Sequence, residues 1–182
     1  MTPPLVRLGA PVLLFVYGTL RLIDGSDGHH DKDGALWNVG HVCFFVAFTL
    51  LAVLTVDVYR ALRPVHVTSA RRNVALAAMA AGVFGAACFL WVIVGDLFPS
   101  FPELPAALQI AGPALYQIGM VTLLVLLVIA RLVPVWSPVL VVAAFAAIGV
   151  NLDLIPLAAV LLFAGLMPLG RSAHRVAGPA SR

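Results

Sequence analysis

The chain has 182 residues, of which 62% are hydrophobic and only 10% are charged, and its formal net charge is +3. A soluble domain is typically about half apolar and about a quarter charged, so this composition excludes an ordinary soluble protein. The basic residues flank hydrophobic segments and form no patch with interleaved aromatic residues, which indicates a lipid bilayer as the partner and excludes a nucleic acid. Lys32 is the single lysine among eleven basic residues, a bias that suggests a GC-rich bacterial genome.

Six hydrophobic segments follow one another along the chain, and each is long enough to cross the hydrocarbon core of a bilayer as a helix. We predict spans at residues 5–23, 35–58, 73–98, 104–130, 133–150 and 153–170. The last two spans come from one apolar stretch of 38 residues, which as a single helix would be roughly 57 Å long and would overshoot the membrane. We place the break at Asn151 and Asp153, with Pro156 in the first turn of the sixth helix and Asp153 as its N-cap.

The basic residues are divided unequally between the two sets of loops. Nine of them lie on the side that carries both termini: Arg7, Arg60, Arg63, Arg71, Arg72, Arg131, Arg171, Arg175 and Arg182. The opposite loops hold only Arg21 and Lys32. Because lysine and arginine are retained on the cytoplasmic side, we predict an all-α, polytopic bundle of six transmembrane helices with both ends in the cytoplasm. Residues 1–182 would form a single domain in the inner (plasma) membrane.

Small residues repeat at four-residue spacing on the third predicted span, at Ala78, Gly82 and Ala86. In lipid, such a row lets two helix backbones approach closely. We therefore predict that Gly82 lies at a helix–helix contact. The sequence is also compatible with a homo-oligomer.

Polar residues gather in the half of the bundle that this topology places outside. Asn38 and His41 are three residues apart on the second span and therefore share a helix face. Asp96 ends the third span, Tyr116 lies on the fourth, and Asp153 lies in the last outer turn. Because polar groups at membrane depth are costly, they mark functional sites. The sequence predicts an outward-opening polar pocket with five candidate catalytic residues: His41, Asp96, Asn38, Tyr116 and Asp153.

Three functions of different classes are compatible with this pattern. The first is an enzyme acting on a lipid or isoprenoid, a hydrophobic small molecule, with His41 as general base or proton relay and Asp96 as acid. The second is a small transporter or channel built from two inverted groups of three spans. The third is a non-catalytic subunit or scaffold of a membrane complex. The enzyme is favoured because the polar residues cluster at one depth, whereas a permeation route would continue to the inner side.

The polar loop at residues 24–34 is rich in oxygen ligands. Asp31 and Asp33, followed by Gly34, match the middle of an EF-hand calcium loop. The match fails at both ends, because the first ligand would be His29 and the twelfth would be Gly40, where a bidentate acid is needed. We therefore expect a solvated turn and no metal site. No nucleophile elbow, phosphate-binding glycine loop or HExxH motif occurs in the sequence, and no cofactor is indicated.

Overall fold

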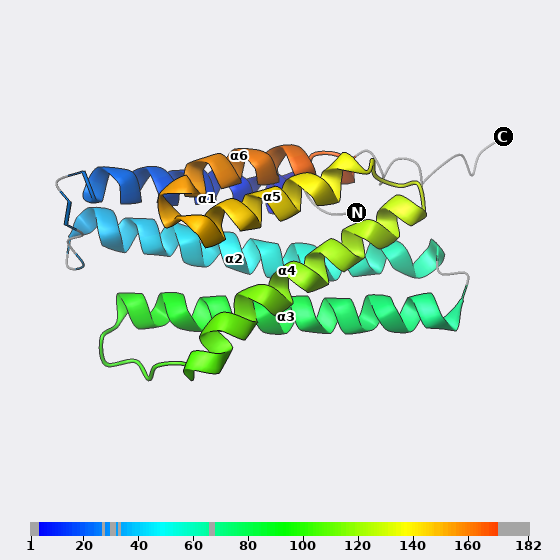
Figure 1. The fold of residues 1–182 in the computed structure, drawn as a ribbon, viewed down its shortest axis with the longest axis horizontal. Helices are drawn as coiled ribbons and strands as arrows, with labels where there is room; N and C mark the ends of the chain where they lie inside the picture. Colours follow the sequence, from blue (N-terminus) through cyan, green and yellow to red (C-terminus); the bar gives the residue numbers. More distant parts are fainter. Residues whose placement is uncertain (1–3, 27, 30–31, 33, 66–67, 171–182) are drawn as a thin grey trace.

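The computed structural model describes residues 4–26, 28–29, 32, 34–65 and 68–170. Over these residues the protein consists of six α-helices and two short 3-10 turns, with no strand (Figure 1). The elements in chain order are α1 (Pro4–Asp24), α2 (Ala35–Leu62), η1 (Arg63–Val65), α3 (Ser69–Leu97), α4 (Ala106–Ile129), α5 (Trp136–Val150), η2 (Leu152–Leu154) and α6 (Ile155–Leu166). The prediction of an all-α protein is thus confirmed for the described part of the chain.

Four of the helices, α1 to α4, are long and apolar enough to cross a membrane. The other two are also apolar but shorter, with 15 residues in α5 and 12 in α6. Each helix overlaps one of the six predicted segments. The start of α3 differs most, because Thr68 caps the helix by accepting a hydrogen bond from the backbone N–H of Arg71, which adds a polar first turn to the apolar stretch.

The break between α5 and α6 falls at Asn151, as the sequence predicts. Asn151 has an extended backbone, and its side-chain oxygen accepts a hydrogen bond of 2.9 Å from the backbone N–H of Asp153. Pro156 lies in the first turn of α6, also as predicted. The prediction that Asp153 is the N-cap of α6 is wrong. That position belongs to Leu154, which makes no side-chain cap, and Asn151 performs the capping one turn earlier.

The sixth helix ends at Leu166, earlier than the predicted limit of residue 170. Pro168 explains the early end, because a proline has no backbone N–H to donate to the carbonyl four residues earlier, that of Ala164. The buried hydroxyl of Ser137 in α5 donates a hydrogen bond to the carbonyl of Gly165 in the last turn of α6. This bond joins α5 to α6 at the end of the hairpin that they form.

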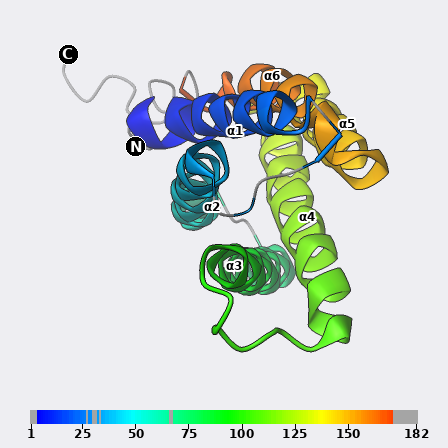
Figure 2. The same cartoon turned by 90° about the vertical axis from the view of Figure 1, so that its left-hand side faces the viewer.

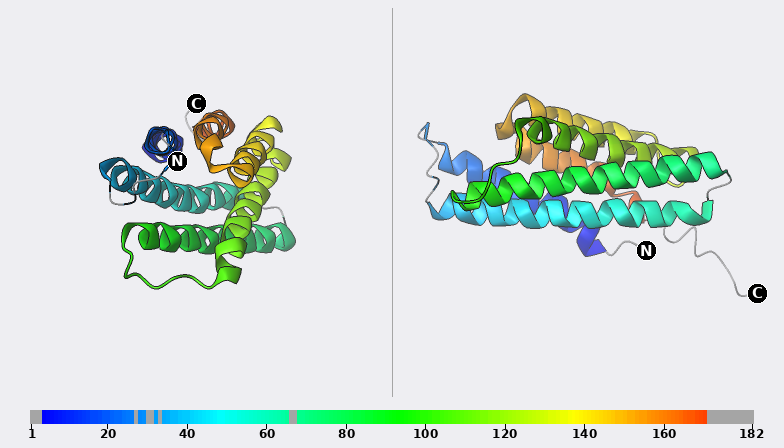
Figure 3. Two further views of the ribbon diagram at one scale, coloured as in Figure 1. Left: turned by 60° about the vertical axis from the view of Figure 1, so that its left-hand side comes forward. Right: turned by 90° about the horizontal axis from the view of Figure 1, so that it is seen from below.

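The helices α1, α2 and α3 lie in a row, and the α5–α6 hairpin packs beside α1 (Figure 2). The second and third helices run alongside each other over most of their length (Figure 3). The fourth helix crosses the bundle obliquely, from the far side of α3 toward α5 (Figures 1 and 2). Its close neighbour is therefore α3, and it meets α5 over a much smaller area.

The two ends of the bundle differ in charge. The end at which α1 begins and α6 ends (Figure 1) carries Arg7, Arg60, Arg63, Arg71, Arg72 and Arg131, and we call it the basic end. The opposite end carries Asp24, Asp96, Glu103 and Asp153, and we call it the acidic end. The outside of the bundle between them is lined with exposed large apolar side chains, which is the arrangement expected of helices that face lipid.

Glycines allow α3 and α4 to pack with their backbones in contact. A Cβ atom built on Gly82 would lie 2.9 Å from Cγ2 of Thr55 in α2, which is too close for a side chain to fit. A Cβ atom on Gly85 would collide with the backbone of Gly112 and Tyr116 in α4. The prediction that Gly82 lies at a helix–helix contact is confirmed, and the contact is a junction of α2, α3 and α4.

Candidate functional site

A cavity of about 570 Å³ opens at the acidic end, between the ends of α2, α3 and α4. Its polar and aromatic lining includes Lys32, Asn38, Trp91, Asp96, Glu103 and Gln109. Two hydrogen bonds hold the loop that follows α3 against the cavity. The indole N–H of Trp91 donates to the carbonyl of Pro102 at 2.9 Å, and the amide of Gln109 donates to the carbonyl of Leu104 at 2.7 Å. The chain between α3 and α4 is thereby fixed as one wall.

Asp96 lies in the last turn of α3, and its carboxylate both lines this cavity and faces α2. Nε2 of His41 is 3.7 Å from Oδ2 of Asp96. The two side chains differ in exposure: the imidazole is 3% exposed and the carboxylate 42%. The pair therefore places a buried ring nitrogen directly behind a carboxylate that solvent or a ligand can reach.

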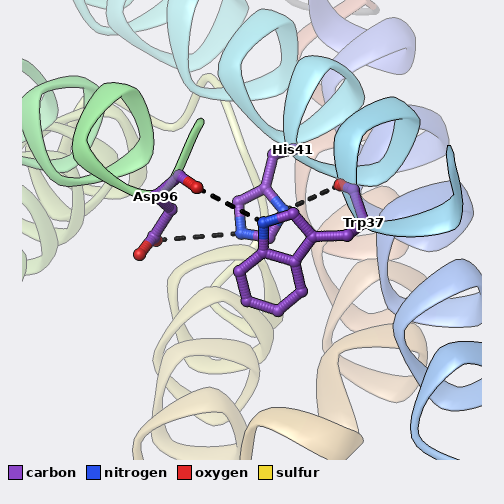
Figure 4. A network of polar contacts seen from close by, with 3 residues as sticks. All are labelled: Trp37, His41 and Asp96. Atoms are coloured by element: carbon purple, nitrogen blue, oxygen red, sulfur yellow. Dashed lines mark hydrogen bonds and ion pairs between the residues drawn. The ribbon is translucent and has the colours of Figure 1, made fainter. Parts of the chain in front are cut away.

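Trp37 holds both members of this pair (Figure 4). It lies one helical turn before His41 on α2, and its carbonyl oxygen is 2.9 Å from Nδ1 of His41. Its indole N–H donates a hydrogen bond of 3.3 Å to the backbone carbonyl of Asp96. The Trp37 and His41 rings also stack in a tilted arrangement, with centroids 4.1 Å apart. One residue thus orients the imidazole and ties the end of α3 to α2.

The hydrogen bond to Trp37 determines which ring nitrogen of His41 can accept a proton. A carbonyl oxygen has no proton to give, so Nδ1 must be the protonated nitrogen. In the neutral ring Nε2 then carries the lone pair, and it is this atom that faces Asp96. A distance of 3.7 Å exceeds that of a direct hydrogen bond. The carboxylate is nevertheless close enough to stabilise a positive charge on the imidazole electrostatically.

A second group of side chains surrounds the other side of His41. The ring of Tyr17 in α1 meets the imidazole edge-on, with centroids 5.3 Å apart, and stacks on Phe44 at 4.3 Å. Arg21, one turn further along α1, places Nε 3.7 Å from Oδ1 of Asp153. These contacts join α1 to α2 and to the turn before α6. His41 therefore lies near the place where α1, α2 and the turn before α6 meet.

The structure brings together only some of the five predicted site residues. His41 and Asp96 are in contact, and Asn38 lines the same cavity as Asp96. Asp153 lies apart from them, paired with Arg21 and half exposed. The expectation that Tyr116 shares the pocket is not met. Its side chain is fully buried, in a cluster with the rings of Phe48, Phe89 and Phe145.

Three residues of this region were not predicted from the sequence: Tyr17, Arg21 and Trp37. Trp37 had a usable signal, because residues four apart on a helix share a face and Trp37 is four residues before His41. Tyr17 and Arg21 had no such signal, since only the packing of α1 on α2 brings them to this place. The positions Asp31 and Asp33 of the oxygen-rich loop lie outside the described residues. Among the residues that are described, no group of three or more His, Cys, Asp or Glu side chains is arranged to hold a metal ion.

Comparison of the chain with protein-family models, with curated proteins and with solved structures gives no match, so the site has to be interpreted from its own geometry.

Proposed function

We propose that the chain is a multi-pass protein of the inner (plasma) membrane that catalyses a proton transfer on a lipid or isoprenoid substrate at its acidic end. In this proposal all six helices span the membrane, and both ends of the chain are cytoplasmic. The arginines of the basic end support the orientation, because cytoplasmic loops retain basic residues. Both α5 and the segment from η2 to α6 have 15 residues, or about 22 Å of helix each, so the bilayer would have to thin locally around this hairpin.

The observation that carries the enzymatic proposal is the His41–Asp96 contact at the wall of the cavity. A neutral His41 with its proton on Nδ1 presents a basic Nε2, and a carboxylate within 3.7 Å stabilises the imidazolium that forms when Nε2 takes a proton. In the proposed step a substrate hydroxyl in the cavity gives its proton to the carboxylate of Asp96, the member of the pair that lines the cavity, and Nε2 of His41 then takes this proton as a relay. The restored carboxylate balances the charge of the imidazolium, and the substrate oxygen is left negatively charged as the reacting group. Trp37 keeps the ring in the required orientation.

The mixed lining of the cavity supports an amphipathic substrate. Asn38, Gln109 and Lys32 offer hydrogen bonds and one positive charge to a polar head group. Trp91 and Phe101 provide aromatic surface in the same cavity, of the kind that proteins place at the level of lipid head groups. We propose that the head group enters this cavity while the hydrophobic tail stays in the surrounding lipid.

One observation favours a non-catalytic subunit as the second candidate. The imidazole of His41 is almost fully buried, and it lies behind Asp96 instead of lining the cavity itself. A purely structural histidine would look the same, with Trp37 and Asp96 as its hydrogen-bonding and electrostatic partners. The two candidates differ in what they predict for variants of His41 and Asp96.

The test uses purified protein reconstituted with a lipid extract, with lipid consumption followed by mass spectrometry. We expect the unaltered chain to convert a lipid, and His41→Gln and Asp96→Asn to reduce the rate by about 10²- to 10⁴-fold without lowering the melting temperature. Asp57→Asn is the matched control, because Asp57 is an acid on α2 that pairs with Arg60 far from the site. If His41→Gln lowers stability while Asp96→Asn changes nothing, the non-catalytic candidate is correct.

A further inference from the structure

A tight turn at the basic end carries an arginine in an unusual backbone conformation. After the last residues of α4, the N–H of Arg131 donates to the carbonyl of Val128 at 2.8 Å, and the N–H of Leu132 donates to Leu127 at 2.9 Å. These two bonds form a Schellman motif, in which the first residue beyond the helix cap adopts a left-handed conformation that glycine normally provides. Here that residue is Arg131, with φ of 58°.

Arginine is a costly choice at this position. Its Cβ atom crowds the backbone when φ is positive, whereas glycine has no Cβ and avoids the strain. Arg131 is the only non-glycine residue with a positive φ among those that the structure describes. Strained residues of this kind cluster at sites that hold ligands. The backbone conformation therefore makes the side chain of Arg131 a candidate for ligand binding.

A cavity of about 550 Å³ lies directly beside this turn. Its lining includes Arg131, Pro134, Trp136 and Pro168, and none of the described residues that line it is acidic. Arg131 is exposed and forms no ion pair with any described residue. The positive charge at this cavity is thus uncompensated by the described part of the chain.

Two further features make the cavity suited to an anion at a membrane surface. The side chain of Trp136 is about half exposed, and tryptophan is enriched at the boundary between lipid tails and head groups. Trp136 also begins α5, whose N-terminal end carries the positive pole of the helix dipole. The residue before it, Val135, supplies no side-chain cap to this helix end.

We propose that this cavity binds the phosphate of an anionic phospholipid from the leaflet at the basic end, with Arg131 as the phosphate ligand. A guanidinium group matches two phosphate oxygens at once, and basic pockets between helices on the cytoplasmic side are a known way to bind such head groups. The inference uses the membrane-spanning part of the proposed function. It is independent of the chemistry at the acidic end, because His41 lies near the start of α2 at that end, whereas Arg131 follows the end of α4 at the basic end.

The test compares melting temperatures of the full chain in nanodiscs of phosphatidylcholine alone and of phosphatidylcholine mixed with phosphatidylglycerol. We expect phosphatidylglycerol to raise the melting temperature of the unaltered chain by several degrees, since a ligand that binds only the folded state stabilises it. Arg131→Gly and Arg131→Gln should lose most of this rise. Arg131→Gly has a relaxed backbone at the turn and should fold at least as well as the unaltered chain in phosphatidylcholine.

The matched control is Arg72→Gln, an exposed arginine of the basic end on α3, which should keep the full rise. His41→Gln should also keep it, which separates this inference from the proposed chemistry. An equal rise in all variants, or no rise in the unaltered chain, would overturn the inference. So would a full rise produced by inorganic phosphate in phosphatidylcholine nanodiscs, because the ligand would then be a soluble anion and not a lipid.

Discussion

Gly82 in α3 and Gly119 in α4 pack backbone to backbone. A Cβ atom built on Gly119 would lie 2.6 Å from the nitrogen and 2.8 Å from Cα of Gly82. Such a close approach maximises van der Waals contact between two helices, and in lipid this contact is a main source of helix association. The oblique crossing of α4 over α3 depends on it. The crossing also sets where the cavity at the acidic end lies, since both helices contribute to its wall.

Enlarging either glycine should destabilise the bundle. We expect Gly82→Leu and Gly119→Leu each to cost about 1–3 kcal/mol or more, because the helices must move apart to admit the side chain. The measurement is thermal unfolding of the purified protein in one detergent. Gly149→Leu is the control, since a Cβ atom on Gly149 meets nothing within 4 Å. An unchanged melting temperature for Gly82→Leu would refute the importance of this contact.

The hydrogen bond between His41 and Trp37 predicts the tautomer of His41. We expect Nδ1 to carry the proton and Nε2 to carry the lone pair in the neutral ring, because a backbone carbonyl can only accept. The ¹⁵N spectrum of protein labelled at histidine reports this directly, and His41→Gln identifies the signal among the five histidines of the chain. Trp37→Phe should leave the tautomer unchanged, since it retains the carbonyl. A neutral ring with a protonated Nε2 would contradict the geometry.

The Arg21–Asp153 ion pair should contribute little to stability. Asp153 is half exposed, and the two atoms are 3.7 Å apart, so water and salt screen the attraction. We expect a coupling energy below about 1 kcal/mol in a double-mutant cycle of Arg21→Gln and Asp153→Asn, decreasing further at high salt. The exposed Asp57–Arg60 pair, at 3.4 Å, is a reference for a surface contact. A coupling of several kcal/mol would show instead that the pair is shielded from water.

The proposed topology makes a direct prediction for reporter fusions. A reporter placed after Arg182 should be active in the cytoplasm, and one inserted in the 24–34 loop should be active outside. The reason is the concentration of arginines at the basic end. If only one of α5 and α6 crosses the membrane, the number of spans is odd and the reporter after Arg182 lies outside. An external signal at that position would exclude the model with six spans.

The six helices and the interruptions between them could be predicted from the sequence alone. In lipid no water is present to hydrogen-bond to the backbone N–H and C=O groups, so an apolar run long enough to cross the bilayer predicts a helix. The break at Asn151 follows from polar residues and Pro156, which are local signals, and the contact at Gly82 follows from its row of small residues. The apolar run predicts a helix up to residue 170, but α6 ends at Leu166, before Pro168.

Which polar residues come into contact depends on the packing of the helices and could not be predicted from the sequence. Hydropathy gives the depth of a residue along its helix, but it does not give the rotation of that helix or its tilt. The oblique crossing of α4 buries Tyr116 among aromatic rings, although the sequence predicts that Tyr116 shares a pocket with His41. The packing of α1 against the start of α6, where Gly18 lies against Pro156, brings Arg21 to Asp153. The contact of His41 with Asp96 likewise requires α2 and α3 to turn the correct faces toward each other. Rotation and tilt are set by the steric fit of side chains across helix interfaces, and that fit involves residues far apart in the chain.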